Sequence, residues 1–209
     1  EVVTTVANAW EDLAFDYRTI NTSNAYHNIV VIFDNGTPGD GSANFTFYMD
    51  DIRLTDAMPN SKIDLPVTFD VAGVNYTVTD FGNNQTVDAV DPTNANNKVK
   101  KTTKVNGAET WAGTTIGTNT GFATAIPLTA AASQMSVRVY SPAAGIKVLL
   151  KVEDHTNNQR SVETFATTTT AGEWETLIFD FNNQAPGTAA FNATYTFTMA
   201  SIFFDFGNS

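Results

Sequence analysis

The sequences MSVRVY at residues 135–140 and IKVLLKVE at residues 146–153 decide the fold class. In both stretches apolar side chains recur at every second position, a period typical of half-buried β-strands. Further strands are expected at residues 67–69, 75–80, 98–104, 163–169, 175–181 and 200–206, with turns rich in Gly, Pro and Asn between them. Short strands at this spacing predict an all-β protein, an antiparallel β-sandwich with the jelly roll as the preferred topology.

An internal repeat sets the frame for these strands. The matching segments, in chain order, are Thr4-Thr5 with the threonine run at 167–170, WEDLAFDY at 10–17 with WETLIFDF at 174–181, and FDNG at 33–36 with FDFG at 204–207. The last pair follows an apolar run in both places. Matching segments in the same order indicate tandem copies of one module.

The repeat also divides the chain. Residues 1–57 are expected to be the C-terminal half of one jelly-roll module, residues 58–61 a linker, and residues 62–209 a second module. Residues 45–54 (FTFYMDDIRL) are expected to be the closing strand of the first copy, and the second copy lacks its counterpart. Because a half-module exposes apolar faces and a strand edge, residues 1–57 should pack against the second module, another chain or further sequence.

The composition narrows the function classes. The formal net charge of −11 argues against nucleic acid and anionic membranes as partners, and it fits a neutral polymer, divalent cations or solubility alone. The absence of cysteine excludes disulfides, thiolate nucleophiles and Cys-based zinc sites. No apolar run approaches the length that crosses a bilayer, so no membrane insertion is expected. Few charges beside abundant Thr and Asn favour a secreted or cell-surface location, and a chain that begins at Glu1 looks like a piece of a longer precursor.

Five segments resemble the galactose-binding-like jelly-roll carbohydrate-binding modules of secreted Bacteroidetes-type bacterial proteins. They are VTFD at 67–70, ETWAG at 109–113, MSVRVYSP at 135–142, GEWETL at 172–177 and FFDFG at 203–207. The resemblance covers nearly the whole chain and departs from the family at the missing closing strand of the second copy. It implies polysaccharide binding by a module appended to a glycan-degrading enzyme or a cell-surface protein.

The acidic pair Asp50-Asp51 suggests a metal site. If Ile52 and Leu54 face the core, Asp50 on the same strand face points inward, where a carboxylate is costly unless it is paired or bound to metal. Calcium takes such oxygens readily. The resemblance implies a structural calcium there, with Asp70 as the acidic residue near the start of the second module. The alternative is that hydrogen bonds from backbone or Arg satisfy Asp50.

Two places are candidate sugar sites. Trp111 lies in a polar, Gly-punctuated stretch, where an indole face could stack on a sugar ring; alternatively, it folds over the end of the sandwich. Residues 153–160 form a dense polar hairpin, with Asp154, His155, Asn157, Asn158 and Arg160 as candidate ligands for sugar hydroxyls. The alternative for this hairpin is a solvated tip. Trp10 and Trp174, which recur in the repeat, are expected to be packing residues.

Catalysis is not expected. Jelly-roll glycoside hydrolases need two carboxylates aimed at one bond, and the adjacent pairs Glu11-Asp12 and Glu153-Asp154 would face opposite sides of a strand. No nucleophile elbow, P-loop or zinc motif is present. The sequence therefore predicts a non-catalytic polysaccharide-binding protein that has neighbouring copies of the same module as further partners. The alternative is a structural tandem-repeat stalk, adhesin or filament module without a functional sugar site.

Overall fold

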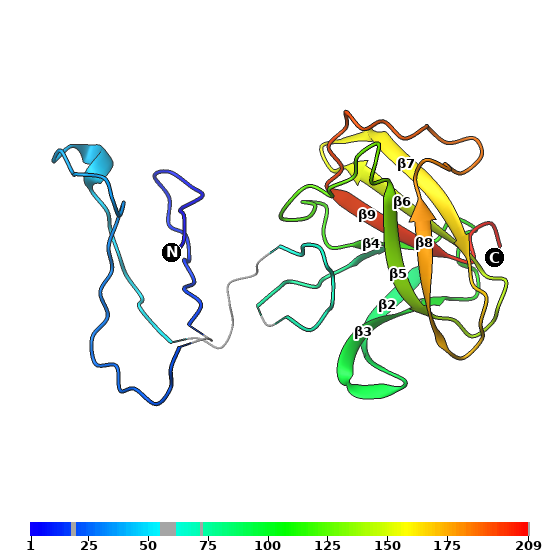
Figure 1. The fold of residues 1–209 in the computed structure, drawn as a ribbon, viewed down its shortest axis with the longest axis horizontal. Coiled ribbons are helices and arrows are strands. Elements are labelled where there is room, and N and C mark those ends of the chain that lie inside the picture. The colour runs from blue at the N-terminus through cyan, green and yellow to red at the C-terminus, as the bar shows by residue number, and fades with distance from the viewer. Residues whose placement is uncertain (18–19, 55–61, 72, 209) are drawn as a thin grey trace. The chain divides into compact units, whose positions relative to one another are not determined.

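The computed structural model describes residues 1–17, 20–54, 62–71 and 73–208. The chain divides into two compact units, Glu1–Pro59 (unit 1) and Asn60–Ser209 (unit 2), drawn in Figure 1. The linker expected at residues 58–61 lies outside the described residues. No helix in the described ranges is long and apolar enough to cross a membrane.

Unit 2 is built on a five-stranded antiparallel sheet with the order β1-β4-β9-β6-β7. Its strands are β1 (Thr79–Phe81), β4 (Gly113–Ile116), β6 (Lys147–Asp154), β7 (Asn157–Thr167) and β9 (Met199–Phe204). The central strands β6 and β9 pair Leu150 with Ile202 and Val152 with Ala200. All four of these side chains are buried, because they belong to the hydrophobic core that packs on one face of the sheet.

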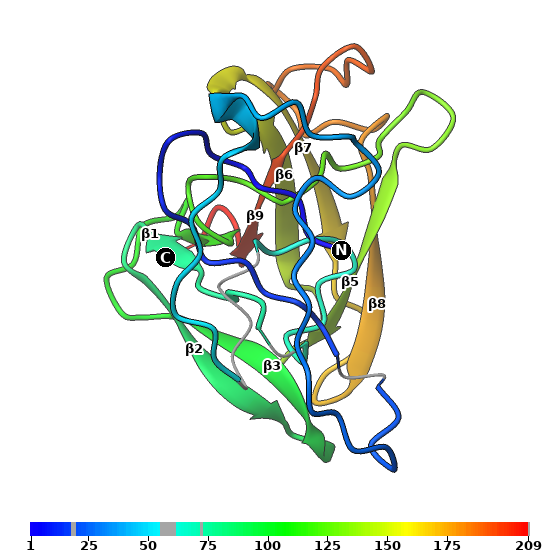
Figure 2. The same ribbon diagram turned by 90° about the vertical axis from the view of Figure 1, so that its left-hand side faces the viewer.

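Two further antiparallel pairs complete the unit: β2 (Asn84–Asp91) with β3 (Asn94–Lys104), and β5 (Gln134–Tyr140) with β8 (Trp174–Asp180). Figure 2 shows β5 and β8 as a layer beside β6, β7 and β9. The predicted all-β class and antiparallel sandwich are thereby confirmed.

The core lies between these layers. From the β5–β8 layer, Val139, Leu177 and Phe179 point inward, whereas Thr176 and Ile178 point to solvent, as the period of two requires. The opposing side chains come from the five-stranded sheet and are Val148, Leu150, Val152, Val162, Ala200 and Ile202. Phe179 and Phe181 are 0% exposed, so the second copy of the repeated aromatic motif anchors this core.

Two of the strands expected in unit 2 are absent or shorter than predicted, and one observed strand was not predicted. Residues 67–69 form no strand, and only Thr79–Phe81 forms at the end of the expected 75–80 strand. The pattern missed β2, because its apolar residues Val87 and Val90 point to solvent. Its inward side chain Thr86 instead lies 3.0 Å from the Thr102 hydroxyl and 2.8 Å from the Thr114 hydroxyl. A polar network thus takes the place of the apolar signal.

Unit 1 has a different character. Its described residues contain one short 3-10 helix, η1 (Ala43–Phe45), and no strand, as the ribbon in Figure 1 shows. None of these described residues is buried. Residues 45–54, the expected closing strand of the first copy, therefore form no strand, and neither do residues 10–17, the counterpart of β8 in the repeat. A strand needs a ladder partner to satisfy its backbone.

Local structure nevertheless recurs between the two copies. The Thr5 amide and hydroxyl donate to the Glu11 carboxylate at 2.9 and 2.8 Å. The Thr169 amide and hydroxyl donate to the Glu175 carboxylate at 3.0 and 2.8 Å. Glu11 and Glu175 occupy matching positions in the repeat, six residues after their threonines.

Two turns recur in the same way. Asn21 and Asn192 each accept, at the side-chain oxygen, the amide two residues ahead, at 3.0 Å in both places. Asp34 and Asp205 both have positive φ, 47° and 51°, and each backbone oxygen accepts the amide three residues on. The repeated sequence thus adopts the same local turns in both units, whereas strands form only in unit 2.

Candidate functional site

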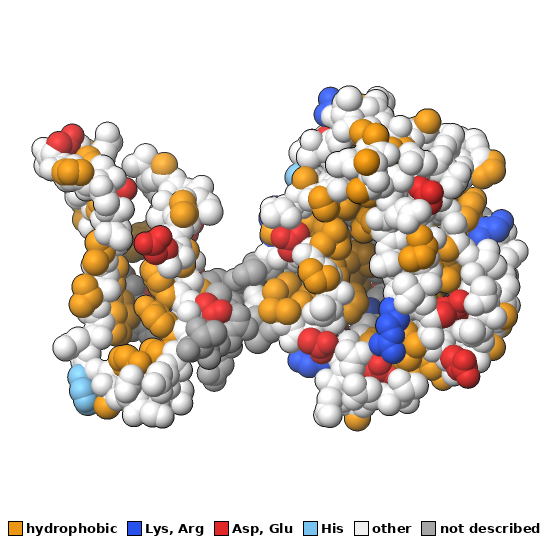
Figure 3. All heavy atoms as spheres, viewed as in Figure 1, with side chains coloured by type: hydrophobic (Ala, Val, Ile, Leu, Met, Phe, Trp, Pro, Cys, Tyr) orange, Lys and Arg blue, Asp and Glu red, His pale blue; other side chains and the backbone are white. Residues whose placement is uncertain are grey.

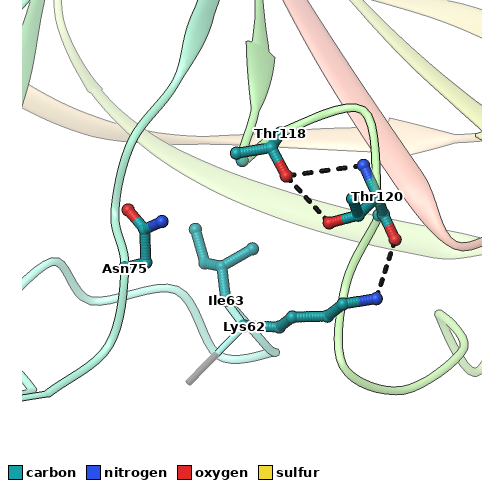
Figure 4. Close-up of a pocket in the computed structure, with 7 residues that line it drawn as sticks. Lys62, Ile63, Asn75, Thr118 and Thr120 are labelled. Carbon is teal, nitrogen blue, oxygen red and sulfur yellow. Dashed lines mark hydrogen bonds between the residues drawn. The ribbon is translucent and has the colours of Figure 1, made fainter. Parts of the chain in front are cut away.

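A small open pocket lies at one end of the sheet in unit 2. It has a volume of about 140 Å³ and is lined by Lys62, Ile63, Asn75, Gly117, Thr118, Thr120 and Gly121. Figure 4 shows the hydroxyls of Thr118 and Thr120 close together, with the Lys62 side chain reaching toward Thr120 and Asn75 on the other side of Ile63. We call it the Thr118–Thr120 pocket. Its rim is mostly polar, with Ile63 as the apolar side chain between the polar ones.

The loop that builds the pocket is fixed on both sides. The Phe122 amide donates to the Thr198 carbonyl at 2.7 Å, and the Ala123 amide donates to the Ile63 carbonyl at 2.9 Å. Gly121 has a φ of +73°, and a Cβ there would lie 2.8 Å from the Thr198 carbonyl oxygen. Only glycine lets the loop come this close to residue 198 in that backbone conformation.

The polar groups of the pocket are already oriented. The Thr118 and Thr120 hydroxyls lie 2.8 Å apart, and the Lys62 ammonium donates to the Thr120 carbonyl at 3.0 Å. Each hydroxyl can donate one bond and accept two, and an ammonium has three donors. The pocket therefore keeps donor and acceptor capacity for a polar ligand after its internal bonds are made.

His155 adjoins this pocket. Its Nδ1 lies 2.8 Å from the Thr198 hydroxyl, which also accepts the His155 amide at 3.1 Å. A Cβ on Gly121 would lie 3.1 Å from the same Nδ1, so the imidazole stands directly beside the pocket loop. Since Nδ1 is engaged by Thr198, Nε2 is the ring nitrogen without a bond among the described residues. The structure thus brings the predicted residue His155 next to a pocket that the sequence did not reveal.

Asp154 has a structural task at the tip of the β6–β7 hairpin. Its Oδ1 accepts the Thr156 amide at 2.9 Å and the Thr156 hydroxyl at 2.6 Å, and its Oδ2 accepts from Arg160 at 3.3 Å. These bonds, with those from Thr156 the largest contribution, lower the pKa of the carboxyl below its usual value although burial opposes them. Asp154 is therefore an ionised turn former with its acceptor sites in use.

The β2–β3 hairpin repeats this arrangement. Asp91 Oδ1 accepts the Thr93 amide and hydroxyl, both at 2.7 Å, and Oδ2 accepts from the Asn97 amide group at 2.9 Å. The shared sequence is Asp-x-Thr-Asn, at residues 91–94 and 154–157. Both strands also shift register at the aspartate. The polar density of the 153–160 hairpin is thus partly explained by turn formation.

The other candidate ligands of the 153–160 hairpin differ in how far their side chains are already used in hydrogen bonds within the protein. The Asn157 side-chain oxygen accepts the Gln159 amide at 3.1 Å, which makes Asn157 a second turn former. The guanidinium of Arg160 lies 5.6 Å from the centre of the Tyr195 ring and is half exposed. Asn158 is exposed at the tip. Residues 155–160 are all exposed, so the candidates His155, Asn157, Asn158 and Arg160 all lie at the solvent-facing tip.

Trp111 belongs to another place. Its ring stacks on Phe81 with centroids 6.2 Å apart and an interplanar angle of 13°, and it is 49% exposed. Phe81 in turn contacts Phe203 edge to face at 5.2 Å. Trp111 is therefore the outermost ring of an aromatic cluster, which agrees with a Trp that folds over the end of the sandwich and leaves one part of the indole in solvent.

The sheet separates the two candidate sugar sites. Trp111 precedes β4, and Thr118 follows it, so they lie at opposite ends of that strand. The register of β9 and β6 places Met199 beside Glu153, at the hairpin end, and Phe204 beside Val148, at the other end. Trp111 and the 153–160 hairpin consequently do not form a single site within unit 2.

The candidate calcium ligands lie in different units. The Asp50 side chain accepts the Asp51 amide at 2.8 Å, and the Asp70 side chain accepts the Lys98 amide at 3.0 Å. Asp50 is exposed, unlike the inward position expected for it. Within the described residues no group of three or more His, Asp or Glu side chains could hold a metal ion. Calcium at Asp50 and Asp70 stays a prediction.

Sequence reasoning missed four polar residues of the pocket, namely Lys62, Asn75, Thr118 and Thr120. The available signal was the segment GTNTG at residues 117–121, in which two glycines bracket hydroxyl and amide side chains. Lys62 and Asn75 join it only through tertiary structure.

Comparisons with known proteins add nothing to this geometry, because no protein family, no curated protein and no solved structure gives a significant match to the chain.

Proposed function

We propose that unit 2 binds a neutral polysaccharide without catalysis, through the Thr118–Thr120 pocket and the adjoining edge of His155. The observation that carries this proposal is an open, hydroxyl-lined pocket whose loop is fixed in place beside an exposed imidazole. Such a module would hold a larger secreted or cell-surface protein on its glycan.

The size of the pocket supports a polymer rather than a free small molecule. Its volume of about 140 Å³ is well below the roughly 300–1,000 Å³ of typical small-molecule sites. A shallow polar depression can hold one residue of a chain that continues across the surface. The net charge of −11 supports a neutral glycan, since an anionic one would be repelled.

The groups around the Thr118–Thr120 pocket and His155 support binding without catalysis. The carboxylate nearest to His155 in sequence, Asp154, already accepts hydrogen bonds from Thr156 and Arg160. A hydrolase of this type needs a protonated acid and a second carboxylate on the two sides of one bond. The lowered pKa of Asp154 argues against it as the acid.

The direct test is affinity gel electrophoresis of the full chain in gels that contain neutral β-glucans and galactans. The Thr118→Ala/Thr120→Ala variant should weaken the affinity for at least one retarding glycan about thirtyfold, because two hydrogen-bonding groups are lost at about 1 kcal/mol each. The matched control is Thr176→Ala, which removes an exposed hydroxyl from the outer face of β8.

The Trp111→Ala variant distinguishes binding at the Trp111 end of β4 from binding at the Thr118–Thr120 pocket. Retardation should persist in this variant, since Trp111 lies at the opposite end of β4. The proposal is wrong if no glycan of the panel retards the chain, or if Trp111→Ala abolishes retardation while Thr118→Ala/Thr120→Ala leaves it intact. Thermal unfolding of each variant controls for loss of fold.

We also propose a second candidate function, that of a structural repeat module in a stalk, adhesin or filament. The observation that favours it is the recurrence of local hydrogen bonds between the two units, at Thr5–Glu11 and Thr169–Glu175 and at the Asp34 and Asp205 turns. Tandem copies of one module are the simplest origin of such a recurrence. In this function the contacts between modules matter more than the sugar pocket.

A further inference from the structure

The free polar groups of the Thr118–Thr120 pocket are mostly hydrogen-bond donors. The Asn75 side-chain oxygen already accepts a backbone amide at 3.0 Å, whereas its NH2 group makes no hydrogen bond within the described chain. Figure 4 shows this nitrogen on the side of Asn75 that faces Ile63. The Lys62 ammonium uses one of its three N–H groups on the Thr120 carbonyl, so the other two are left for a ligand.

The two hydroxyls of the pocket leave one more donor. They lie 2.8 Å apart, and the Thr118 oxygen also accepts the Thr120 amide at 3.4 Å. Whichever hydroxyl donates to the other, the remaining O–H hydrogen stays unused. Among the described residues that line the pocket none is acidic, although the chain has 22 acidic residues and only 11 basic ones. The pocket therefore favours a ligand group that only accepts hydrogen bonds.

One apolar side chain lies deeper than these donors. Ile63 is 2% exposed, whereas Asn75 and Thr118 are half-buried. Gly117, with a φ of +96°, leaves Ile63 within reach of a ligand, because a Cβ at that position would lie 3.0 Å from the Cγ2 methyl of Ile63. The pocket thus combines donors near the surface with an apolar contact below them.

Charge distinguishes two classes of acceptor group. Carboxylates and sulfates are negative, so a chain of net charge −11 repels them, and they have no methyl group to contact Ile63. An acetyl group is neutral, and it has a carbonyl oxygen that accepts hydrogen bonds beside a methyl group. Figure 3 shows few charged side chains among the uncharged ones on the visible face of unit 2, which suits a neutral ligand.

We propose that the Thr118–Thr120 pocket recognises the acetyl substituent of a neutral polysaccharide, carried on either nitrogen or oxygen. The carbonyl oxygen accepts hydrogen bonds from Asn75 and Lys62, and the methyl group packs on Ile63. The sugar hydroxyls beside the substituent bond to the threonine hydroxyls. This inference rests on the proposed glycan binding and names its substrate class.

The test compares neutral ligands that differ only in acetylation, by isothermal titration calorimetry with the full chain. The N-acetyl pair is the β-1,4-linked hexamer of N-acetylglucosamine and the glucose hexamer of the same linkage. The O-acetyl pair is an acetylated glucomannan and the same polymer after alkaline deacetylation. In at least one pair the acetylated ligand should bind about tenfold more tightly, because it adds a hydrogen bond and an apolar contact. The pair that responds identifies the N-acetyl or the O-acetyl group.

Asn75→Asp makes the test specific to the pocket. Aspartate keeps the oxygen that accepts the Thr77 amide, but it replaces the free NH2 group with a carboxylate oxygen, which repels a carbonyl. This variant should lose the preference for the acetylated ligand. Asn119→Asp is the matched control, since it makes the same change at an exposed residue of the pocket loop that does not line the pocket. It should keep the preference. Thermal unfolding shows whether each variant is folded, and the wild-type comparison needs no variant.

Three outcomes overturn the inference and leave glycan binding intact. The first is an acetylated ligand that binds no more tightly than its partner in both pairs, while a glycan still retards the chain in affinity gels. The second is a folded Asn75→Asp variant that keeps the full preference. The third is tighter binding of polygalacturonate than of either acetylated ligand, which would mean that the pocket recognises a carboxylate. If no glycan binds in either experiment, the proposed function is wrong and this inference is wrong with it.

Discussion

At the scale of single residues, the repeat places identical aromatic side chains in opposite environments. Phe179 in β8 is 0% exposed, whereas its counterpart Phe15 in unit 1 is 46% exposed. Trp174 donates its indole N–H to Asp91 at 2.8 Å and carries the Arg138 guanidinium 4.2 Å above its ring. Its counterpart Trp10 is 73% exposed. The chemical identity of a residue therefore does not decide its contribution to stability; its partners do.

This contrast gives a matched pair of variants. Phe179→Ala should destabilise the chain by about 3–5 kcal/mol, because it leaves a cavity in the core between the layers. Phe15→Ala should change the free energy of unfolding by no more than about 0.5 kcal/mol, as expected for an exposed position. Urea denaturation followed by far-UV circular dichroism measures both. Equal effects would contradict the assignment of the core to unit 2.

At the scale of elements, two hairpins share one turn chemistry. Asp91 and Asp154 begin their turns with the same pair of bonds from the threonine two residues on. Burial opposes ionisation of Asp91, but the bonds from Asn97, Thr93 and Trp174 outweigh it and hold its pKa well below the usual range. The β2–β3 hairpin thereby gains a charged anchor that also contacts β8 through Trp174.

This anchor predicts a pH dependence. Because the folded-state pKa of Asp91 is depressed, its contribution is complete above the unfolded value of about 4 and is lost as the pH falls below it. Wild type should therefore exceed Asp91→Asn in stability at pH 6, and the difference should narrow toward pH 2.5. Urea midpoints at both pH values test this.

Asn96→Ala supplies the control for that experiment, because it alters an exposed, non-titrating side chain in the same hairpin. Its difference from wild type should not change with pH. If the difference in urea midpoint between wild type and Asp91→Asn is also the same at both pH values, the hydrogen bonds at this turn do not stabilise the ionised carboxylate.

Among the elements, the period of two predicted β5, β6 and β8 correctly. The alternation fails for β2, where Thr86 rather than an apolar side chain faces Thr102 and Thr114. It also fails at residues 67–69 and 45–54, which have the composition of strands but no ladder partner in the described structure. Propensity alone cannot supply the partner that a strand requires.

At the scale of the whole molecule, the core is confined to one unit. Every buried residue of the described chain lies in unit 2, beginning at Ile63. Unit 1 contains local turns and side-chain contacts such as the Phe33–Phe47 stack at 4.7 Å, but no buried residue among those described. The two units should therefore differ sharply in the free energy of local opening.

Hydrogen exchange provides the measurement at this scale. In a dilute sample, amides of β6 and β9 should exchange slowly, because both strands are paired on each side within the sheet. Amides of residues 10–17 and 29–33 should exchange within seconds to minutes, since no ladder protects them. Slow exchange of residues 10–17 in the dilute monomer would contradict this division of stability.

The period of two in the sequence is enough to predict the β class, and the side chains of Asp34, Asp205 and the Asp-x-Thr-Asn tips are enough to form the local turns. The turns depend on contacts only a few residues apart, so the Asp34 turn forms in unit 1 just as the Asp205 turn forms in unit 2. The tertiary structure alone decided that His155 adjoins Thr118 and Thr120 and that Trp111 lies at the other end of the sheet. Each of these depends on which strands pair, and pairing is fixed by burial between segments that are distant in the chain.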